Sequence, residues 1–270
     1  MSRAPAPAKI NVALVVGPLR HDHKHEVATV LQRIDLADRV AVTASDRLEV
    51  TGFAEDALVR GALEGLAAAA GVEPRFAARI EKRIPVAAGL GGGSSDAATA
   101  LRLANELLPQ PLAAGELRLL AATLGADCPF FLASGPQFGT GDGSELAPLQ
   151  LPQDYWVLLV LPEGARKEST AEVYRRFDER GGHREFEERR AGLARALASV
   201  SQAADLAALP PNDLASSPVA AELIGLGAFR ADVSGAGPAV FGLFLHHRQA
   251  RAARRALRGR GRVWLTVPAW

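Results

Sequence analysis

The chain has 270 residues, of which 48% are hydrophobic and 23% charged, so it is long enough for one large domain or two closely packed ones. Its 31 basic and 30 acidic side chains leave a net charge of +1, which argues against a nucleic-acid partner. The single cysteine, Cys128, excludes an internal disulfide. No segment is apolar and long enough to span a membrane, and no signal sequence opens the chain, so we expect a cytoplasmic protein.

Hydrophobic periodicity predicts strands and helices in alternating groups, a pattern typical of an α+β fold. Strands are predicted at residues 8–16, 39–43, 47–50, 76–81, 155–161 and 263–267, with a further alternating segment at 231–245. Helices are predicted at residues 56–70, 96–108, 115–124, 172–198 with an interruption at 181–182, and 248–257.

A glycine-rich segment, residues 85–96, separates a predicted strand from a predicted helix. The first N–H groups of a helix have no partner within the helix, and glycines let a phosphate approach the backbone, so we expect a phosphate-bearing ligand here. The segment lacks the lysine of a Walker loop and the distal acid of a dinucleotide fingerprint. The alternative is a flexible connector, which four glycines and two capping serines disfavour.

Two charged residues stand out from their surroundings. Lys9 lies in an otherwise small and apolar strand, where an ammonium is costly without a negative partner, and we expect Asp127 or a substrate to be that partner. The alternative is a lysine that reaches solvent from an edge strand. Asp127 follows a glycine that ends a predicted helix, so alone it would be read as a turn or capping residue.

Three motifs occur in a characteristic order: residues 7–12 (PAKINV), the glycine-rich segment, and residues 233–241 (VSGAGPAVF). Together they resemble the GHMP kinases, a family of small-molecule kinases whose phosphate loop differs from the Walker loop. Within that family, residues 91–96, 124–131, 169–174 and 212–214 resemble the members that phosphorylate a cytidine diphosphate ester of methylerythritol during the synthesis of isoprenoid precursors.

The resemblance implies a two-lobed α+β fold with a deep cleft between lobes, an ATP-binding lobe at 1–150 and a second lobe at 151–270. It implies ATP and Mg²⁺ as co-substrates, without naming the metal ligands, and a small-molecule substrate for a monomer or homodimer. It also implies catalytic roles for Lys9 and Asp127 and substrate contacts for Asn11, His25 and Thr170. ATP would bind Pro85, Val86, Ala87, Ala88, Gly89, Leu90, Gly91, Gly92, Gly93, Ser94 and Ser95.

Two positions depart from the pattern of the family. Lys24 replaces an aromatic residue before His25, so stacking on the substrate base would have to come from another ring, such as Tyr174 or Phe177. In the motif at 55–58 the family's asparagine is replaced by Ala57, which removes an amide that could contact adenine.

Other interpretations remain open from the sequence. The alternating histidines at 21, 23 and 25 could bind a metal, although a solvated loop with one substrate-binding histidine is the simpler reading. Cys128 has no neighbouring histidine to activate it and is expected to be a buried core residue. The protein could instead phosphorylate mevalonate, homoserine or a sugar, or bind nucleotides without catalysis.

Overall fold

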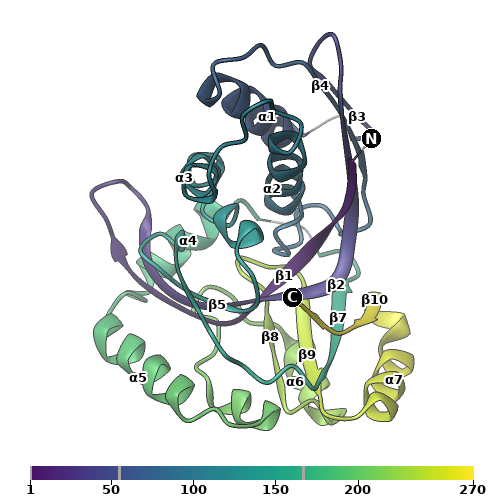
Figure 1. The fold of residues 1–270 in the computed structure, drawn as a ribbon. Helices are drawn as coiled ribbons and strands as arrows, with labels where there is room; N and C mark the ends of the chain where they lie inside the picture. The colour runs from purple at the N-terminus through teal and green to yellow at the C-terminus, as the bar shows by residue number, and fades with distance from the viewer. Residues whose placement is uncertain (1, 54–55, 166–167) are drawn as a thin grey trace. The chain divides into compact units, whose positions relative to one another are not determined.

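The computed structural model describes residues 2–53, 56–165 and 168–270, and both helices and strands are well represented in it (Figure 1). The predicted mixture of α and β elements is confirmed. The chain forms two compact units, and each gathers segments from different parts of the sequence: unit 1 comprises residues 1–8, 36–86 and 91–134, and unit 2 comprises residues 9–35, 87–90 and 135–270. This division differs from the contiguous lobes, 1–150 and 151–270, expected from the sequence.

The interleaving has a simple cause in the two long N-terminal strands, β1 (Ser2–Leu19) and β2 (His25–Ala44). Each of these strands continues from one unit into the other. The sequence analysis found only the middle of β1 and the end of β2, because residues 8–16 are mostly apolar and residues 39–43 alternate, whereas the rest of each strand has a mixed composition.

Unit 1 combines a short sheet with a group of helices. Its remaining elements are β3 (Glu49–Thr51), α1 (Ala57–Ala69), β4 (Phe76–Glu81), α2 (Gly92–Asn105), α3 (Ala114–Leu124) and the 3₁₀ turn η1 (Pro129–Leu132). Strand β4 runs antiparallel to residues 39–44 of β2 and parallel to β3. The predicted alternation of β4 is confirmed, since Phe76, Ala78 and Ile80 are buried.

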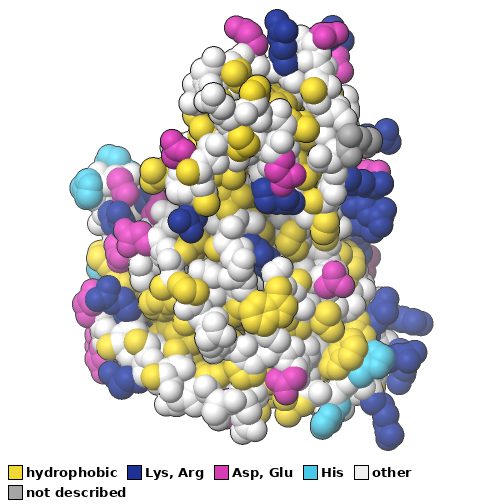
Figure 2. Space-filling model, in the orientation of Figure 1, with side chains coloured by type: hydrophobic (Ala, Val, Ile, Leu, Met, Phe, Trp, Pro, Cys, Tyr) yellow, Lys and Arg dark blue, Asp and Glu magenta, His cyan; other side chains and the backbone are white. Residues whose placement is uncertain are grey.

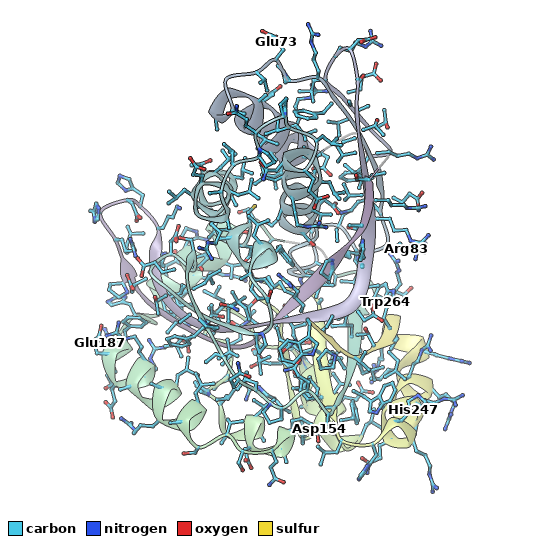
Figure 3. All side chains as sticks on the ribbon, in the orientation of Figure 1. Glu73, Arg83, Asp154, Glu187, His247 and Trp264 are labelled. Carbon is cyan, nitrogen blue, oxygen red and sulfur yellow. The ribbon has the colours of Figure 1, made fainter. Side chains whose placement is uncertain are left out.

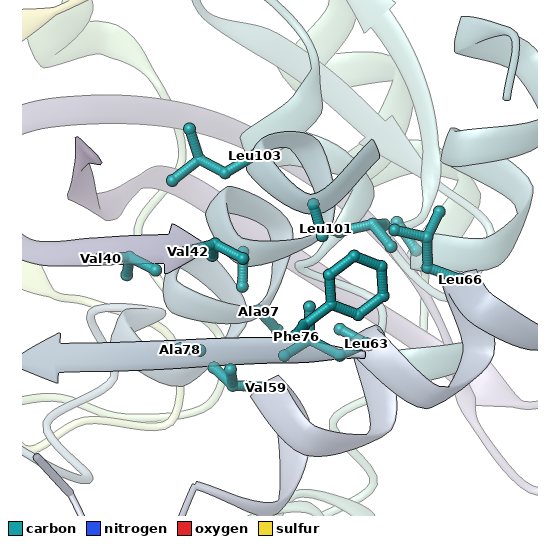
Figure 4. Packing of buried hydrophobic residues seen from close by; sticks show 14 of the residues in the cluster. Val40, Val42, Val59, Leu63, Leu66, Phe76, Ala78, Ala97, Leu101 and Leu103 are labelled. Atoms are coloured by element: carbon teal, nitrogen blue, oxygen red, sulfur yellow. The ribbon is translucent and has the colours of Figure 1, made fainter. Parts of the chain in front are cut away.

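The core of unit 1 lies between this sheet and helices α1 and α2. Figure 4 shows Phe76 beside Leu63, Leu66 and Leu101 in this core. Helix α2 is buried from Ser95 to Leu101, and its many alanines leave room for α1 to pack close against it. The start of α2 is therefore held in place by a closely packed core.

Unit 2 contains the other elements, beginning with β5 (Gln137–Thr140), β6 (Glu145–Pro148) and β7 (Trp156–Pro162). They continue with α4 (Thr170–Glu179), α5 (Phe186–Ala198), η2 (Ala203–Ala208), α6 (Pro218–Gly225), β8 (Arg230–Val233), β9 (Val240–Phe244), α7 (His247–Ala256), η3 (Leu257–Arg260), β10 (Gly261–Thr266) and β11 (Pro268–Ala269). The strands β10, β7, β9 and β8 form an antiparallel sheet in that order, with α6 and α7 packed on it.

A buried arginine joins distant segments of unit 2. The guanidinium of Arg230 donates hydrogen bonds to the carbonyl oxygens of Val12 at 2.8 Å, Leu209 at 2.6 Å and Pro210 at 2.7 Å. Burial lowers the pKa of Arg230 to about 10, while Asp232 opposes that effect. Arg230 therefore fixes the backbone of β1 beside the loop that follows η2.

The basic segment predicted at 248–257 is confirmed as helix α7. Figure 2 shows Lys, Arg and His side chains at the edge of unit 2 where Figure 1 places α7, and His247 and Trp264 are labelled there in Figure 3. The His247 ring lies 4.2 Å from that of Trp156. Among the described residues, no helix is long and apolar enough to cross a membrane.

Candidate active site

Lys9 is buried on β1 and its ammonium is held by a chain of polar groups. Its Nζ donates to the Oδ1 of Asn11 at 2.6 Å, and the Nδ2 of Asn11 donates to the Oγ1 of Thr29 at 2.8 Å. Thr29 in turn donates to the carbonyl oxygen of Ala13 at 2.8 Å. With 4% of Lys9 and 5% of Asn11 exposed, this is a built polar site and not a lysine reaching for solvent.

The three sequence motifs meet within unit 2. The backbone N–H of Lys9 donates to the carbonyl oxygen of Leu90 at 3.0 Å, and that of Ala239 donates to Ala88 at 3.0 Å. The hydroxyl of Ser234 donates to the carbonyl oxygen of Gly89 at 3.0 Å. Residues 87–90 of the glycine-rich segment are therefore fastened to both the first and the third motif.

Gly89 cannot be another residue in this arrangement. Its φ is +81°, and a Cβ built on it would lie 2.2 Å from the carbonyl oxygen of Ser234. A left-handed backbone and so close an approach together require glycine. Ala87 also has a positive φ, at 59°, which is uncommon for a residue with a side chain.

The other part of the segment begins helix α2 in unit 1. The helix starts at Gly92, with Gly91 as N-cap at φ 69°, so the predicted start at Asp96 was wrong by four residues. The left-handed conformation available to Gly91 lets the helix start directly after the loop, which places Ser94, Ser95 and Asp96 in the first turns and not at the cap. The first N–H groups of a helix have no partner within the helix, and the phosphate site predicted at this helix start stays a prediction.

Asp127 lies in the half-buried turn between α3 and η1. The next residue, Cys128, is fully buried as predicted. Burial raises the pKa of the Cys128 thiol to about 11, the nearby Asp127 carboxylate adds to that rise, and a hydrogen bond with the Ser94 side chain opposes it. The Asp127 turn therefore lies close to the start of α2. Lys9 belongs to the other unit, and its pairing with Asp127 stays a prediction.

A cavity of about 450 Å³ opens in unit 2 around His25, which is buried, and Tyr174. The two rings stack at 4.6 Å, and the Nε2 of His25 lies 2.9 Å from the Oδ1 of Asp178. Thr170, the first residue of α4, also lines the cavity. The structure thus brings two of the three predicted substrate residues together, and Asn11 is not among the lining residues.

Lys24, which replaces the family's aromatic residue, lines the same cavity but does not stack on a ring there. Its ammonium forms an ion pair with Asp142, which also accepts hydrogen bonds from the N–H and the hydroxyl of Ser144. Burial raises the pKa of Asp142, but Lys24 and Ser144 outweigh it, and the net effect is a lowered pKa. Among the residues that line this cavity, Tyr174 supplies the aromatic ring that could stack on a base.

The histidine metal site considered above does not form. His21 and His23 are exposed in the turn between β1 and β2, and only His25 is buried. No three His, Cys, Asp or Glu side chains in the described part of the chain are grouped to hold a metal. In the motif at 55–58, Asp56 is the N-cap of α1 and accepts from the N–H of Val59, while Glu55 lies outside the described residues.

Sequence reasoning missed several residues that shape these sites. Asp142 and Asp178 reach the cavity from segments that carry no motif, and Ser234 was noted only as part of a motif. Buried Asp38 and half-buried Lys82 form an ion pair in unit 1, and the signal that could have found Lys82 is its place just before the glycine-rich segment.

Comparison with known proteins identifies the family of this chain. Residues 57–135 match the model of the GHMP kinases N terminal domain, and residues 183–263 match the model of the GHMP kinases C terminal domain. A 4-diphosphocytidyl-2-C-methyl-D-erythritol kinase from Anaeromyxobacter sp. is 40% identical over 92% of this chain and 84% of its own length. The chain belongs to the GHMP kinases.

Further relatives of this GHMP kinase support the same placement. The kinase of that name from Geobacter sulfurreducens is 36% identical over 97% of this chain and 96% of its own length. A crystal structure of 4-(cytidine 5'-diphospho)-2C-methyl-D-erythritol kinase aligns over 100% of both chains with a TM-score of 0.81 and 33% identity. A mevalonate kinase structure, at 15% identity and a TM-score of 0.79, shows the shared fold alone. The predicted GHMP kinase fold is confirmed.

Proposed function

We propose that this enzyme transfers the γ-phosphate of ATP to the 2-hydroxyl of 4-diphosphocytidyl-2-C-methyl-D-erythritol, a step in isoprenoid precursor biosynthesis. The observation that carries the proposal is the 40% identity, over 92% of this chain, to a kinase named for that substrate. Mevalonate and homoserine kinases share the fold at 15% and 16% identity, which gives no support for their substrates.

The cavity around His25 has the groups that a pyrimidine base needs. Tyr174 offers an aromatic face, and His25 and Asp178 offer polar groups at its edge. Lys24 and Arg175 place cationic groups beside it, which a diphosphate would share with their present carboxylate partners. We assign the cytidine end of the substrate to this cavity, with Thr170 at its rim.

The chemistry requires an alcohol to lose its proton as it attacks phosphorus. Asp127 is the proposed base, since its carboxylate belongs to a half-buried turn near Ser94 at the helix start that would bind phosphate. Lys9 is proposed to orient the hydroxyl and offset the charge that develops on the transferred phosphoryl group. The hydrogen bond from Lys9 to the Oδ1 of Asn11 orients the ammonium.

ATP would place its phosphates on the glycine-rich segment from Pro85 to Ser95. The segment supplies backbone N–H groups at the start of α2 and the hydroxyls of two serines. Mg²⁺ is held in such sites by one or two carboxylates and largely by substrate phosphates and water. We propose that it arrives with ATP and neutralises phosphate charge. The dependence on ATP favours a cytoplasmic location.

A substrate panel tests this function. The purified protein is incubated with ATP, Mg²⁺ and each of four alcohols: the cytidine ester, mevalonate, homoserine and a sugar. We expect ADP release with the cytidine ester and phosphorylation at its 2-hydroxyl by ³¹P NMR. Turnover of another alcohol without the cytidine ester would contradict the assignment, and ATP binding without any turnover would favour a silent nucleotide-binding protein.

A further inference from the structure

Two buried carboxylates and one half-buried lysine of unit 1 lie at the ends of the glycine-rich segment. The Nζ of Lys82 lies 2.5 Å from the Oδ2 of Asp38 and 2.6 Å from the Oδ2 of Asp96. Both carboxylates are fully buried, and 16% of the Lys82 side chain is exposed. Burying two carboxylates is costly unless a cation meets them, so Lys82 compensates for both.

The network holds the chain just before the glycine-rich segment. The Oδ1 of Asp38 accepts the backbone N–H groups of Arg83 and of Ile84, the latter at 2.8 Å. Because Asp38 lies on β2, these contacts tie residues 82–84 to the sheet of unit 1. The Arg83 side chain itself is exposed and points away from the protein (Figure 3).

The same network holds the helix that follows the segment. Asp96 lies in the second turn of α2, and its Oδ1 has no hydrogen-bond partner among the described residues. The Oδ2 contact with Lys82 is therefore what anchors this carboxylate. The two ends also meet directly, since a Cβ on Gly92 would lie 3.2 Å from the Cγ2 of Ile84 and 3.4 Å from the Nζ of Lys82.

We propose that Asp38, Lys82 and Asp96 are positioning residues that keep both ends of the glycine-rich segment in the conformation that binds ATP. The inference rests on the proposed phosphate-binding role of that segment. A Walker loop has a lysine within the loop, whereas here Lys82 lies just before the glycine-rich segment. Its ammonium pairs with two carboxylates. Lys82 therefore affects ATP binding indirectly, by fixing the backbone of the glycine-rich segment.

The main variant is Lys82→Met, which keeps the aliphatic stem and removes the charge. Loss of one hydrogen bond to a charged group weakens binding about 10- to 100-fold, so we expect the Kd and KM for ATP to rise by about that factor. The KM for the alcohol and kcat at saturating ATP should change less than about threefold, because none of the three residues is among those that line the cavity at His25. Lys82→Arg should recover most of the ATP affinity.

The matched control is Arg83→Met, which removes the same charge from the adjacent residue but leaves its backbone N–H on Asp38. We expect its ATP affinity to stay within about twofold of the wild type. Hydrogen exchange adds a local readout: peptides covering residues 85–95 should exchange faster in Lys82→Met, whereas peptides of α3 should not. An equal rise in the exchange rate of both sets of peptides would show a general structural role and overturn the proposal.

ATP affinity is measured by titration calorimetry without the alcohol, which separates this inference from the proposed function. If the wild-type protein binds ATP but phosphorylates no alcohol, the proposed function is contradicted, and the positioning role of the three residues can still be tested by ATP binding. If folded Lys82→Met binds ATP as tightly as Arg83→Met does, the proposed positioning role is overturned. If Lys82→Met does not fold, Asp96→Asn decides instead, because it removes one of the two carboxylates that Lys82 contacts. An ATP affinity of folded Asp96→Asn equal to that of the wild type would overturn the proposal.

Discussion

The ammonium of Lys9 donates its hydrogen bond to the side-chain oxygen of Asn11, two residues further along the same strand. Asn11 therefore orients a group proposed for catalysis without needing to touch phosphate. Asn11→Leu should lower kcat about 10- to 100-fold, because the ammonium loses its fixed direction. Steady-state kinetics test this, with Thr29→Val, which leaves the Lys9–Asn11 bond in place, expected to be much milder. Equal losses in the two variants would contradict the orienting role.

Asp127→Asn keeps the size of the side chain but cannot accept a proton at neutral pH. Loss of a positioned general base typically costs about 10² to 10⁴ in rate, and a loose phosphoryl transfer would place the loss near the lower end. Lys9→Met should cost a similar factor. If the two act as one unit, the double variant should be little worse than either single variant in kcat. Near-normal turnover by a folded Asp127→Asn protein would place the base elsewhere.

Gly89→Ala tests the close packing of the glycine-rich segment on the third motif. The added methyl would meet the carbonyl oxygen of Ser234 at 2.2 Å, so we expect loss of ATP binding and a lower melting temperature. Gly115→Ala is the control, because a Cβ there has nothing within 4 Å and lies in helix α3. Differential scanning calorimetry should show that Gly115→Ala is as stable as the wild type or stabilised by up to about 1 kcal/mol.

Tyr174 is the proposed stacking partner of the substrate base. Removing an aromatic platform costs about 1 to 3 kcal/mol per base, so Tyr174→Ala should raise the KM for the cytidine ester about 5- to 150-fold. The KM for ATP should not change. Tyr174→Phe retains the ring and should bind nearly as well as the wild type. A larger effect on ATP than on the cytidine ester would remove Tyr174 from the proposed cytidine cavity.

The buried carboxyl group of Asp96 should make the free energy of unfolding depend on pH. Burial raises its pKa from 3.8 to about 7, although the hydrogen bond from Lys82 opposes that rise. Between these values the folded protein holds a proton that the unfolded chain has released, so this carboxyl group destabilises the fold increasingly as pH rises from about 4 to about 7. Asp96→Asn should flatten this part of the profile. Chemical denaturation at several pH values measures it, and parallel profiles for both proteins would contradict the shift.

Strands could be predicted from the sequence where their residues are mostly apolar, whether one face is buried, as in β4, or both faces, as in β7. Phe76, Ala78 and Ile80 alternate because the opposite face of β4 is less buried, whereas β5 and β6 are short and mixed in composition. The start of α2 was misplaced because serines normally cap helices, and here the left-handed Gly91 takes that position. The convergence of residues 87–90 on Ser234 depends on contacts about 145 residues apart, which no local pattern reports.

The Lys82 network was missed for a related reason. A lysine at the end of a half-buried strand is ordinarily solvated, and nothing near it in the sequence shows that two buried carboxylates face it. Asp38 is 46 residues from the Ile84 N–H group that it accepts. Motif resemblance identified the residues proposed to touch ligands, but it carried no information about those that hold the motifs in place.

The buried guanidinium of Arg230 has a consequence for synthesis on the ribosome. Strand β1 emerges first, yet the donor for its Val12 carbonyl lies 218 residues later in the chain. At about 5 to 20 residues per second, the apolar stretch around Lys9 waits about 11 to 44 seconds for that partner. The Val12 carbonyl therefore gains this donor only when translation is nearly complete, long after strand β2, which pairs with β1, has been made.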